Sequence, residues 1–350
     1  MNAHLEWLRD NVLRQPRGAA LSEAQLGELA AMVRSNASLA HTVLTAAALT
    51  AHTQVVDWCM QHTAARPWVV ARTLLCARCC AVGSFTLEAH CQPDAHAVMG
   101  GVVWNTAPLL AACCGGNLDL LCYWMREHAE CATGVRDATL RDYCASTAVL
   151  WASRRGHGAV VKFLVRVVGC SPQTERDFMG NTALIVACAR GHVDVARWLV
   201  LEAGACAKTE RNKDDDTALT LASWYGRLNV VKWLITEAGI CAKTERNKNG
   251  DTALINACDG GHLDVARWLV AHAGSCAPTD RNKDGETPLL LACHKGHLDV
   301  ARWLLAEAGS SIDEKTNVRL CKSWDSFLAL RHSIHRLRGV AEMLCSAGQV

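Results

Sequence analysis

Residues 287–300 read TPLLLACHKGHLDV, and this stretch decides the fold because close copies of it recur along the chain. Copies begin at residues 182, 217 and 252, so that each step to the next copy is 35 residues. A tryptophan and a glycine keep the same step, at Trp198, Trp233, Trp268 and Trp303 and at Gly204, Gly239, Gly274 and Gly309. A fixed period of this length predicts a repeat architecture.

Each copy reads as two short helices followed by a polar loop. Leu184, Ala187 and Cys188 are spaced for one apolar helical face, and residues 195–200 supply a second apolar face. The stretch 209–216 is rich in turn-forming residues. Because one such unit cannot bury both faces alone, neighbouring copies are expected to stack into a linear solenoid.

Weaker copies precede the regular ones. Thr147-Ala148-Val149 fits one step before residue 182, and Ala107-Pro108-Leu109 fits before that with five extra residues between them. The segment 42–60 aligns without gaps four steps before Thr182 to Trp198. Residues 72–89 read as a badly degraded unit, whose worn first helix would be Leu74 to Val82.

These copies resemble the ankyrin repeat. The resemblance rests on Thr287-Pro288-Leu289, on Leu291-Ala292-Cys293 and on Gly296 to Val300, and it covers about 147–310 strongly and 42–125 weakly. It implies an all-α solenoid of six to eight helix-turn-helix units with helical caps. It also implies a non-enzymatic interaction scaffold or adaptor that binds a partner protein through the concave face of the array.

The chain departs from the family pattern in two respects. Its period of 35 residues exceeds the usual period of about 33. The family's usual histidine after Thr-Pro-Leu is replaced by Ile185, Thr220, Ile255 and Leu290. This replacement removes a side-chain hydrogen-bond link, so we expect apolar contacts, including the tryptophan ladder, to compensate.

The chain is expected to contain four segments. Residues 1–37 read as an N-terminal helical cap, in which Ser22 and Gln25 form a capping box for a second helix. Residues 38–104 hold degenerate ankyrin-like repeats, 105–310 the repeat array and 311–350 a C-terminal helical cap.

The amino-acid composition argues against a nucleic-acid partner and against a membrane span. With 36 Lys plus Arg and 34 Asp plus Glu among 350 residues, the net charge is +2, which argues against a nucleic-acid partner. No uncharged run of 18 apolar residues occurs, so no membrane span is expected. The 19 cysteines fall mostly inside apolar helical patterns and no export signal is visible. They read as reduced, buried thiols of an intracellular protein, cytoplasmic or nuclear.

Two sets of residues are candidate metal sites. His157, His192, His262 and His297 share one repeat position, but stacked helices stand about 8–10 Å apart and zinc ligands must lie within about 2.1 Å of the ion. In the family this histidine caps the turn between the helices, and we expect the same here. Cys76, Cys79, His90 and Cys91 have spacing compatible with zinc, although only one C-x-x-C occurs.

Catalysis finds little support, because no phosphate-binding glycine loop and no nucleophile motif occur. We therefore expect neither an enzyme nor a cofactor.

The binding residues are expected near the end of each first helix, where the otherwise uniform repeat varies most. They are Arg154, Arg155, Arg190, Trp224, Tyr225, Asp259, His294 and Lys295. Trp224 and Tyr225 would be the anchor, because Trp, Tyr and Arg dominate binding hot spots; the alternative is that Trp224 packs on a neighbouring helix. Charged loop-tip residues such as Glu210, Arg211, Glu245 and Arg246 would add a mixed-charge edge.

We expect a monomer that binds a protein partner. A zinc-bearing or nucleic-acid-associated regulatory adaptor remains the alternative, with a basic stretch at Arg319 to Arg338 as its second feature. A purely structural spacer is a further alternative.

Overall fold

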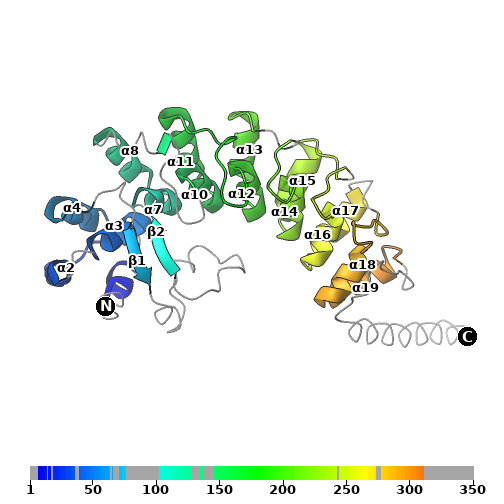
Figure 1. The fold of residues 1–350 in the computed structure, drawn as a ribbon, viewed down its shortest axis with the longest axis horizontal. Coiled ribbons are helices and arrows are strands. Elements are labelled where there is room, and N and C mark those ends of the chain that lie inside the picture. Colours follow the sequence, from blue (N-terminus) through cyan, green and yellow to red (C-terminus); the bar gives the residue numbers. More distant parts are fainter. Residues whose placement is uncertain are drawn as a thin grey trace, which may run out of the picture. The chain divides into compact units, whose positions relative to one another are not determined.

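A computed structural model describes residues 7–13, 15–16, 19–35, 39–63, 65, 71–75, 102–106, 108–127, 135–136, 146–205, 207, 209–242, 244–272 and 277–310. The chain divides into two compact units. Figure 1 labels their helices and strands. The first holds Met1–Ala187 and Asp194–Ala205, and the second holds Cys188–Val193 and Cys206–Val350. Each unit is described by itself.

The first unit consists mainly of paired helices. In chain order they are the π-helix η1 (Arg9–Leu13), α2 (Glu23–Ser35), α3 (Leu39–Thr50), α4 (Thr53–His62), α7 (Pro108–Gly115), α8 (Leu118–Glu127), α10 (Ala148–Arg155), α11 (Gly158–Phe163), the π-helix η2 (Leu164–Val168) and α13 (Val193–Leu201). Helix α12 (Ala183–Arg190) crosses the division between the units. The first helices α3, α7 and α10 pack one against the next.

The predicted capping box at the N-terminal end is confirmed. The Ser22 backbone N–H donates to Gln25 Oε1 at 2.9 Å, and the Gln25 backbone N–H donates to Ser22 Oγ at 3.3 Å. Leu29 and Val33 of α2 are buried, as its expected apolar face requires.

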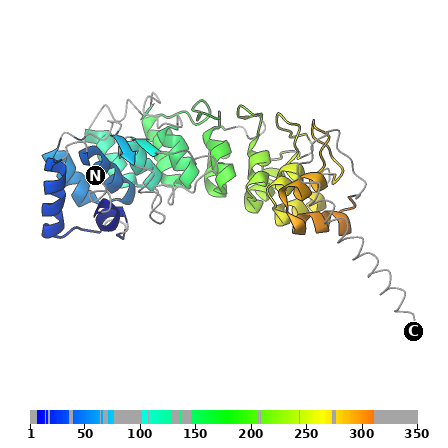
Figure 2. The same cartoon turned by 60° about the horizontal axis from the view of Figure 1, so that its bottom comes forward.

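A short β-hairpin pairing was not expected. Strands β1 (Ala71–Leu75) and β2 (Val102–Thr106) are antiparallel, with Ala71 opposite Thr106. Figure 2 shows the two strands as arrows. Leu74 and Leu75 lie in β1, so the helix predicted over Leu74 to Val82 is wrong at these two residues. β-Branched and aromatic residues in β2 favour extended backbone, and α3 contacts α7 directly rather than through another helical pair.

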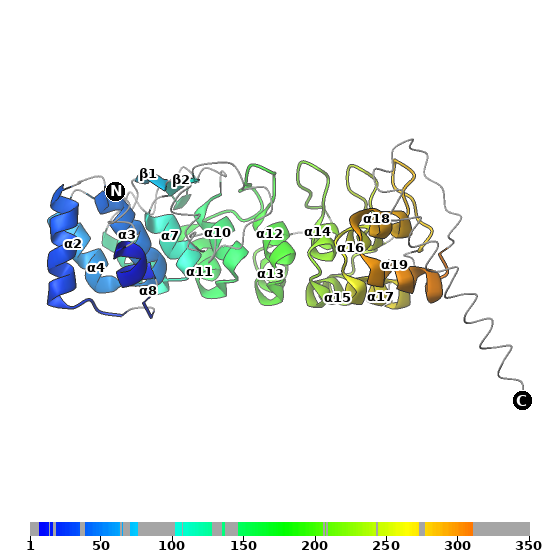
Figure 3. The ribbon, with the colours of Figure 1, turned by 90° about the horizontal axis from the view of Figure 1, so that it is seen from below.

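The second unit repeats one helix pair. Its helices are α14 (Ala218–Trp224), α15 (Leu228–Thr236), α16 (Ala253–Asp259), α17 (Leu263–His272), α18 (Pro288–Lys295) and α19 (Leu298–Ala306). First helices α14, α16 and α18 contact in order, and so do second helices α15, α17 and α19. Figure 3 shows these as two layers, with the polar loops beside the first helices.

Threonine begins each of these first helices. Thr217, Thr252 and Thr287 lie at the N-caps, and each hydroxyl accepts the backbone N–H three residues later. Where the family has histidine, Ile255 is fully buried, whereas Thr220 Oγ1 accepts a hydrogen bond from the Thr217 N–H at 2.8 Å. Apolar packing therefore replaces the missing histidine at Ile255, and a capping box replaces it at Thr220.

The tryptophan ladder is largely buried. Trp198 in the first unit and Trp233 and Trp303 in the second are buried, whereas Trp268 is half-buried. The repeated cysteines Cys188, Cys258 and Cys293 are buried as well, which confirms that they pack as small core residues. Burial raises the pKa of the Cys188 and Cys258 thiols well above the usual range.

Several neighbouring repeats are joined by a hydrogen bond from the residue before the second helix. His297 Nε2 lies 3.0 Å from the carbonyl oxygen of Asp259, at the end of the preceding first helix. Arg227 Nε donates to the carbonyl oxygen of Ala189 at 3.1 Å, and His262 bonds to the carbonyl of Trp224. We call these the carbonyl links. They satisfy helix-end carbonyls that otherwise lack an intrahelical partner.

The first unit contains the same link. His157 Nε2 lies 2.8 Å from the Cys114 carbonyl oxygen, and Asn117 Nδ2 donates to the Ala48 carbonyl. His52 bonds instead to the carbonyl oxygens of Val12 and Ala19 in the N-terminal segment. His157 and His297 make no side-chain cap and bond instead to the preceding repeat, so the expectation that this histidine caps the turn between the helices is wrong at these two positions.

Gly261 leaves room for the His297 ring, which makes the carbonyl link to Asp259. It has φ +76°, and a Cβ atom there would lie 2.5 Å from His297 Nδ1. Gly296 has φ +82°, but no described residue lies within 4 Å of its Cβ position. Gly261→Ala should therefore cost about 2–4 kcal/mol of unfolding free energy, and Gly296→Ala about 1–2 kcal/mol from backbone strain alone.

Urea unfolding of both variants checks this expectation. Equal losses for the two alanines would show that the His297 ring contributes nothing beyond the glycine's own conformation.

The links also predict a pH dependence. The pKa of His262 is lowered, chiefly by burial, and the charges around it are Asp264, Arg227 and His297. The folded chain therefore binds a proton there less readily than the unfolded chain, so His262 stabilises the fold above the usual histidine pKa. That contribution is lost as the pH falls through the lowered pKa.

Asparagine provides the control, since Asn117 makes the same link in another repeat. When the pH falls from about 7.5 to about 5, the unfolding free energy of His262→Asn should decrease less than that of the wild type. Identical losses in urea unfolding at the two pH values would contradict this.

Candidate protein-binding surface

The most varied positions of the repeat lie at the ends of the first helices. In the second unit six of the predicted binding residues occupy them, and we call these six residues the helix-one row. Its members are Arg190, Trp224, Tyr225, Asp259, His294 and Lys295. They lie at the ends of the first helices α12, α14, α16 and α18 of four successive repeats, with Tyr225 at the C-cap of α14.

Side-chain contacts join most of this row. Trp224 Nε1 donates to Asp259 Oδ2 at 3.2 Å, across one repeat step. The Trp224 and Tyr225 rings lie 4.8 Å apart between centroids and are tilted by 57°. The indole therefore bonds to a carboxylate through its N–H and lies beside a second ring.

Cations lie at both ends of this contact series. The Arg190 guanidinium lies over the Tyr225 ring, 5.8 Å from its centroid. Lys295 Nζ lies 3.6 Å from Asp259 Oδ1, and 49% of the Lys295 side chain is exposed. The row thus runs in the order cation, aromatic pair, carboxylate, cation.

Trp224 keeps an exposed face within this arrangement. It is 36% exposed and ranks among the exposed large hydrophobic residues of the described chain. The alternative that Trp224 packs on a neighbouring helix holds only in part, because its N–H contacts α16 while part of its ring faces solvent. A fixed and partly exposed indole is a suitable anchor for a partner.

A mostly apolar strip lies one helical turn before the row. Leu221, Asn256 and Leu291 occupy the same position in α14, α16 and α18. Asn256 is only 8% exposed, and its amide nitrogen has no hydrogen-bond partner among the described residues. This residue is the one polar member of the strip in the second unit.

Arg154 and Arg155 hold the equivalent positions in the first unit. Arg154 Nη2 lies 3.6 Å from Asp177 Oδ2, and its guanidinium lies 5.2 Å from the Trp151 ring centroid. Its side chain is therefore 20% exposed. Arg155 is half-buried, and the binding role of both arginines remains a prediction.

The charged residues at the loop tips make contacts within the protein, whereas the sequence predicted a mixed-charge edge for a partner. Arg246 donates from Nη1 to the Gly250 carbonyl at 2.7 Å and to the Arg281 carbonyl of the next loop at 3.2 Å. Glu210 and Glu245 are buried, and Arg211 pairs with Glu245 at 3.3 Å. These charges hold neighbouring loops together, a role that the sequence analysis missed although the charged residues recur in register.

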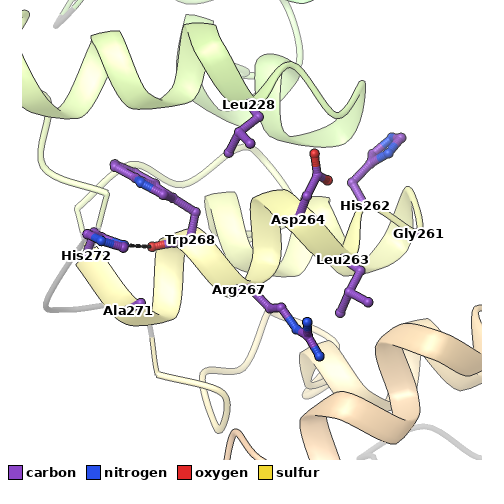
Figure 4. Close-up of a pocket in the computed structure, with 9 residues that line it drawn as sticks. All are labelled: Leu228, Gly261, His262, Leu263, Asp264, Arg267, Trp268, Ala271 and His272. Carbon is purple, nitrogen blue, oxygen red and sulfur yellow. Dashed lines mark hydrogen bonds between the residues drawn. The ribbon is translucent and has the colours of Figure 1, made fainter.

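A shallow pocket of about 680 Å³ lies on the second-helix side (Figure 4). It follows α17, with Leu228 of α15 on its border, and contains no member of the helix-one row. Its polar groups already have partners: His272 Nδ1 lies 3.2 Å from the Trp268 carbonyl oxygen, and Arg267 pairs with Glu307.

No group of three His, Cys, Asp or Glu side chains comes together as a metal site within the described part of the chain. Cys76, Cys79, His90 and Cys91 lie outside the described residues, as does the basic stretch from Arg319 to Arg338. Of the helices that the structure describes, none is both long enough and apolar enough to cross a membrane.

Comparison with protein families now decides the family. A model described as "Ankyrin repeats (3 copies)" matches residues 109–210, 150–245 and 237–316, which together cover more than half of the chain. The chain belongs to the ankyrin repeat family. No characterised protein matched the chain in a search of curated sequences.

Membership confirms the predicted all-α ankyrin solenoid for the repeat array, with the β1–β2 pairing as a local addition. Ankyrin repeats are in general protein–protein interaction modules, and they are typically not enzymes.

Proposed function

We propose that this ankyrin protein is a non-enzymatic scaffold or adaptor that binds a protein partner through the helix-one row. The observation that supports this most directly is the exposed Trp224 indole, held in place by Asp259 and Tyr225. An anchor fixed before binding loses little conformational freedom when the partner arrives. The row also varies between repeats whose buried positions are nearly uniform.

Opposite charges flank Trp224 in the helix-one row. Arg190 lies beyond Tyr225, and Asp259 lies on the opposite side of Trp224. A partner with an apolar group over Trp224 and an acidic group toward Arg190 would match that end. Arg190 should act mainly on the association rate and on its salt dependence, as charges at an interface rim do.

The cellular setting is part of the same proposal. Buried thiols such as Cys188 and Cys258 fit a reducing intracellular compartment, cytoplasmic or nuclear. We propose a monomer, because the repeats within each unit cover one another's apolar faces. The zinc-bearing or nucleic-acid-associated adaptor is the alternative class, and zinc content and the salt dependence of binding distinguish it.

Affinity capture from native lysate tests the proposal. Trp224→Ala should weaken binding of the captured partner by at least about 2 kcal/mol, or about 30-fold in Kd, while the unfolding curve changes little. Trp268→Ala is the matched control, because it removes a partly exposed tryptophan from the second-helix side.

The opposite pattern would contradict the proposal. Loss of the partner in Trp268→Ala with full binding by Trp224→Ala would assign binding to the second-helix face. Failure to capture any partner with the wild-type chain would favour a structural spacer.

A further inference from the structure

We propose that Asp259, Trp224 and Asn256 form a subsite for an arginine side chain of the partner. This inference rests on the proposed function, since it assigns the chemistry that one part of the helix-one row recognises. These three residues lie on α14 and α16 of the second unit.

The carboxylate is the first element of the subsite. Asp259 is the only acid in the helix-one row, and 22% of its side chain is exposed. Its Oδ2 accepts the Trp224 indole N–H, which places the carboxylate beside the edge of an exposed ring. A guanidinium can bond to a carboxylate through two N–H groups and also lie against an aromatic face.

Lys295 shows that a cation is accommodated at this carboxylate. Its Nζ lies 3.6 Å from Asp259 Oδ1, which is beyond ordinary hydrogen-bond length. The lysine is half exposed, and such ion pairs contribute little in water. An arginine from a partner would make shorter, two-pronged contacts and displace it.

Asn256 supplies an independent observation. It lies three residues before Asp259 in α16, and residues at this spacing share a helix face. It is more than nine-tenths buried, yet its amide nitrogen has no hydrogen-bond partner in the described structure. An unpaired buried donor is costly, and the amide can rotate to meet a carbonyl oxygen of a bound chain.

The flanking residues define the rest of the bound segment. Leu221 and Leu291 lie on either side of Asn256 in the same strip, one on α14 and one on α18. Arg190 lies beyond Tyr225 and would repel a second cation at that end. The site therefore fits an arginine flanked by apolar residues, rather than a generally basic segment.

Selection of peptides tests this chemistry. A displayed library of random dodecapeptides is selected on the full chain, and the selected peptides are then titrated against variants. Arginine should be enriched among them, and Asp259→Asn should lower their affinity at least about tenfold. Asparagine keeps an acceptor for the Trp224 N–H, so the ring stays in place while the charge is lost.

Lys295 gives a result that a merely structural role would not produce. Lys295→Met removes the competing cation and should raise peptide affinity by about two- to fivefold. Lys232→Met, an exposed lysine on α15, is the control and should change nothing. Unfolding curves for all variants verify that the fold is retained.

If the selection yields no peptide, titration with a small arginine compound tests the subsite directly. N-acetyl-arginine-methylamide should shift the Trp224 indole N–H resonance, and N-acetyl-glutamate-methylamide should not. No shift with the arginine compound would overturn the subsite.

The outcomes separate this inference from the proposed function. Selected peptides that need Trp224 but carry no excess arginine, or that bind Asp259→Asn unchanged, overturn the arginine subsite and leave the binding row standing. Peptides that bind equally well without Trp224 overturn both.

Discussion

The carbonyl link between neighbouring repeats is the interaction on which the rest of this structure depends. A helix end leaves carbonyl groups without intrahelical partners, and here the next repeat supplies a donor to one of them. His297 bonds to Asp259, Arg227 to Ala189 and His157 to Cys114. Different side chains make the link, so the requirement is a donor of sufficient reach rather than histidine chemistry.

The carbonyl link and the proposed binding surface meet at one residue, Asp259. The carbonyl of Asp259 accepts the link from His297, while its side chain belongs to the helix-one row. The backbone is thus fixed at the residue whose carboxylate orients Trp224. At the loop tips Arg246 bonds to a carbonyl oxygen of its own loop and to one of the next loop, so this charge holds two loops together.

Sequence reasoning predicted the parts of the fold that periodicity controls. The helix pairs, the Ser22–Gln25 capping box and the burial of Cys258 all follow from patterns within one or two turns. It could not predict contacts between side chains one repeat apart, such as Trp224 with Asp259, because these depend on stacking geometry. The β1–β2 pairing was missed since its strands lie far apart in the chain and form no repeat.

Amide hydrogen exchange of a His297→Ala variant tests the central role of the carbonyl link most directly. In a linear array each repeat is held by its neighbours, so losing this bond should release α18 and α19 first. We predict faster exchange across residues 288–306, with 253–272 much less affected, and recovery of protection in His297→Asn if the amide reaches the same carbonyl. Unchanged exchange, or an equal increase over both pairs of helices, would contradict it.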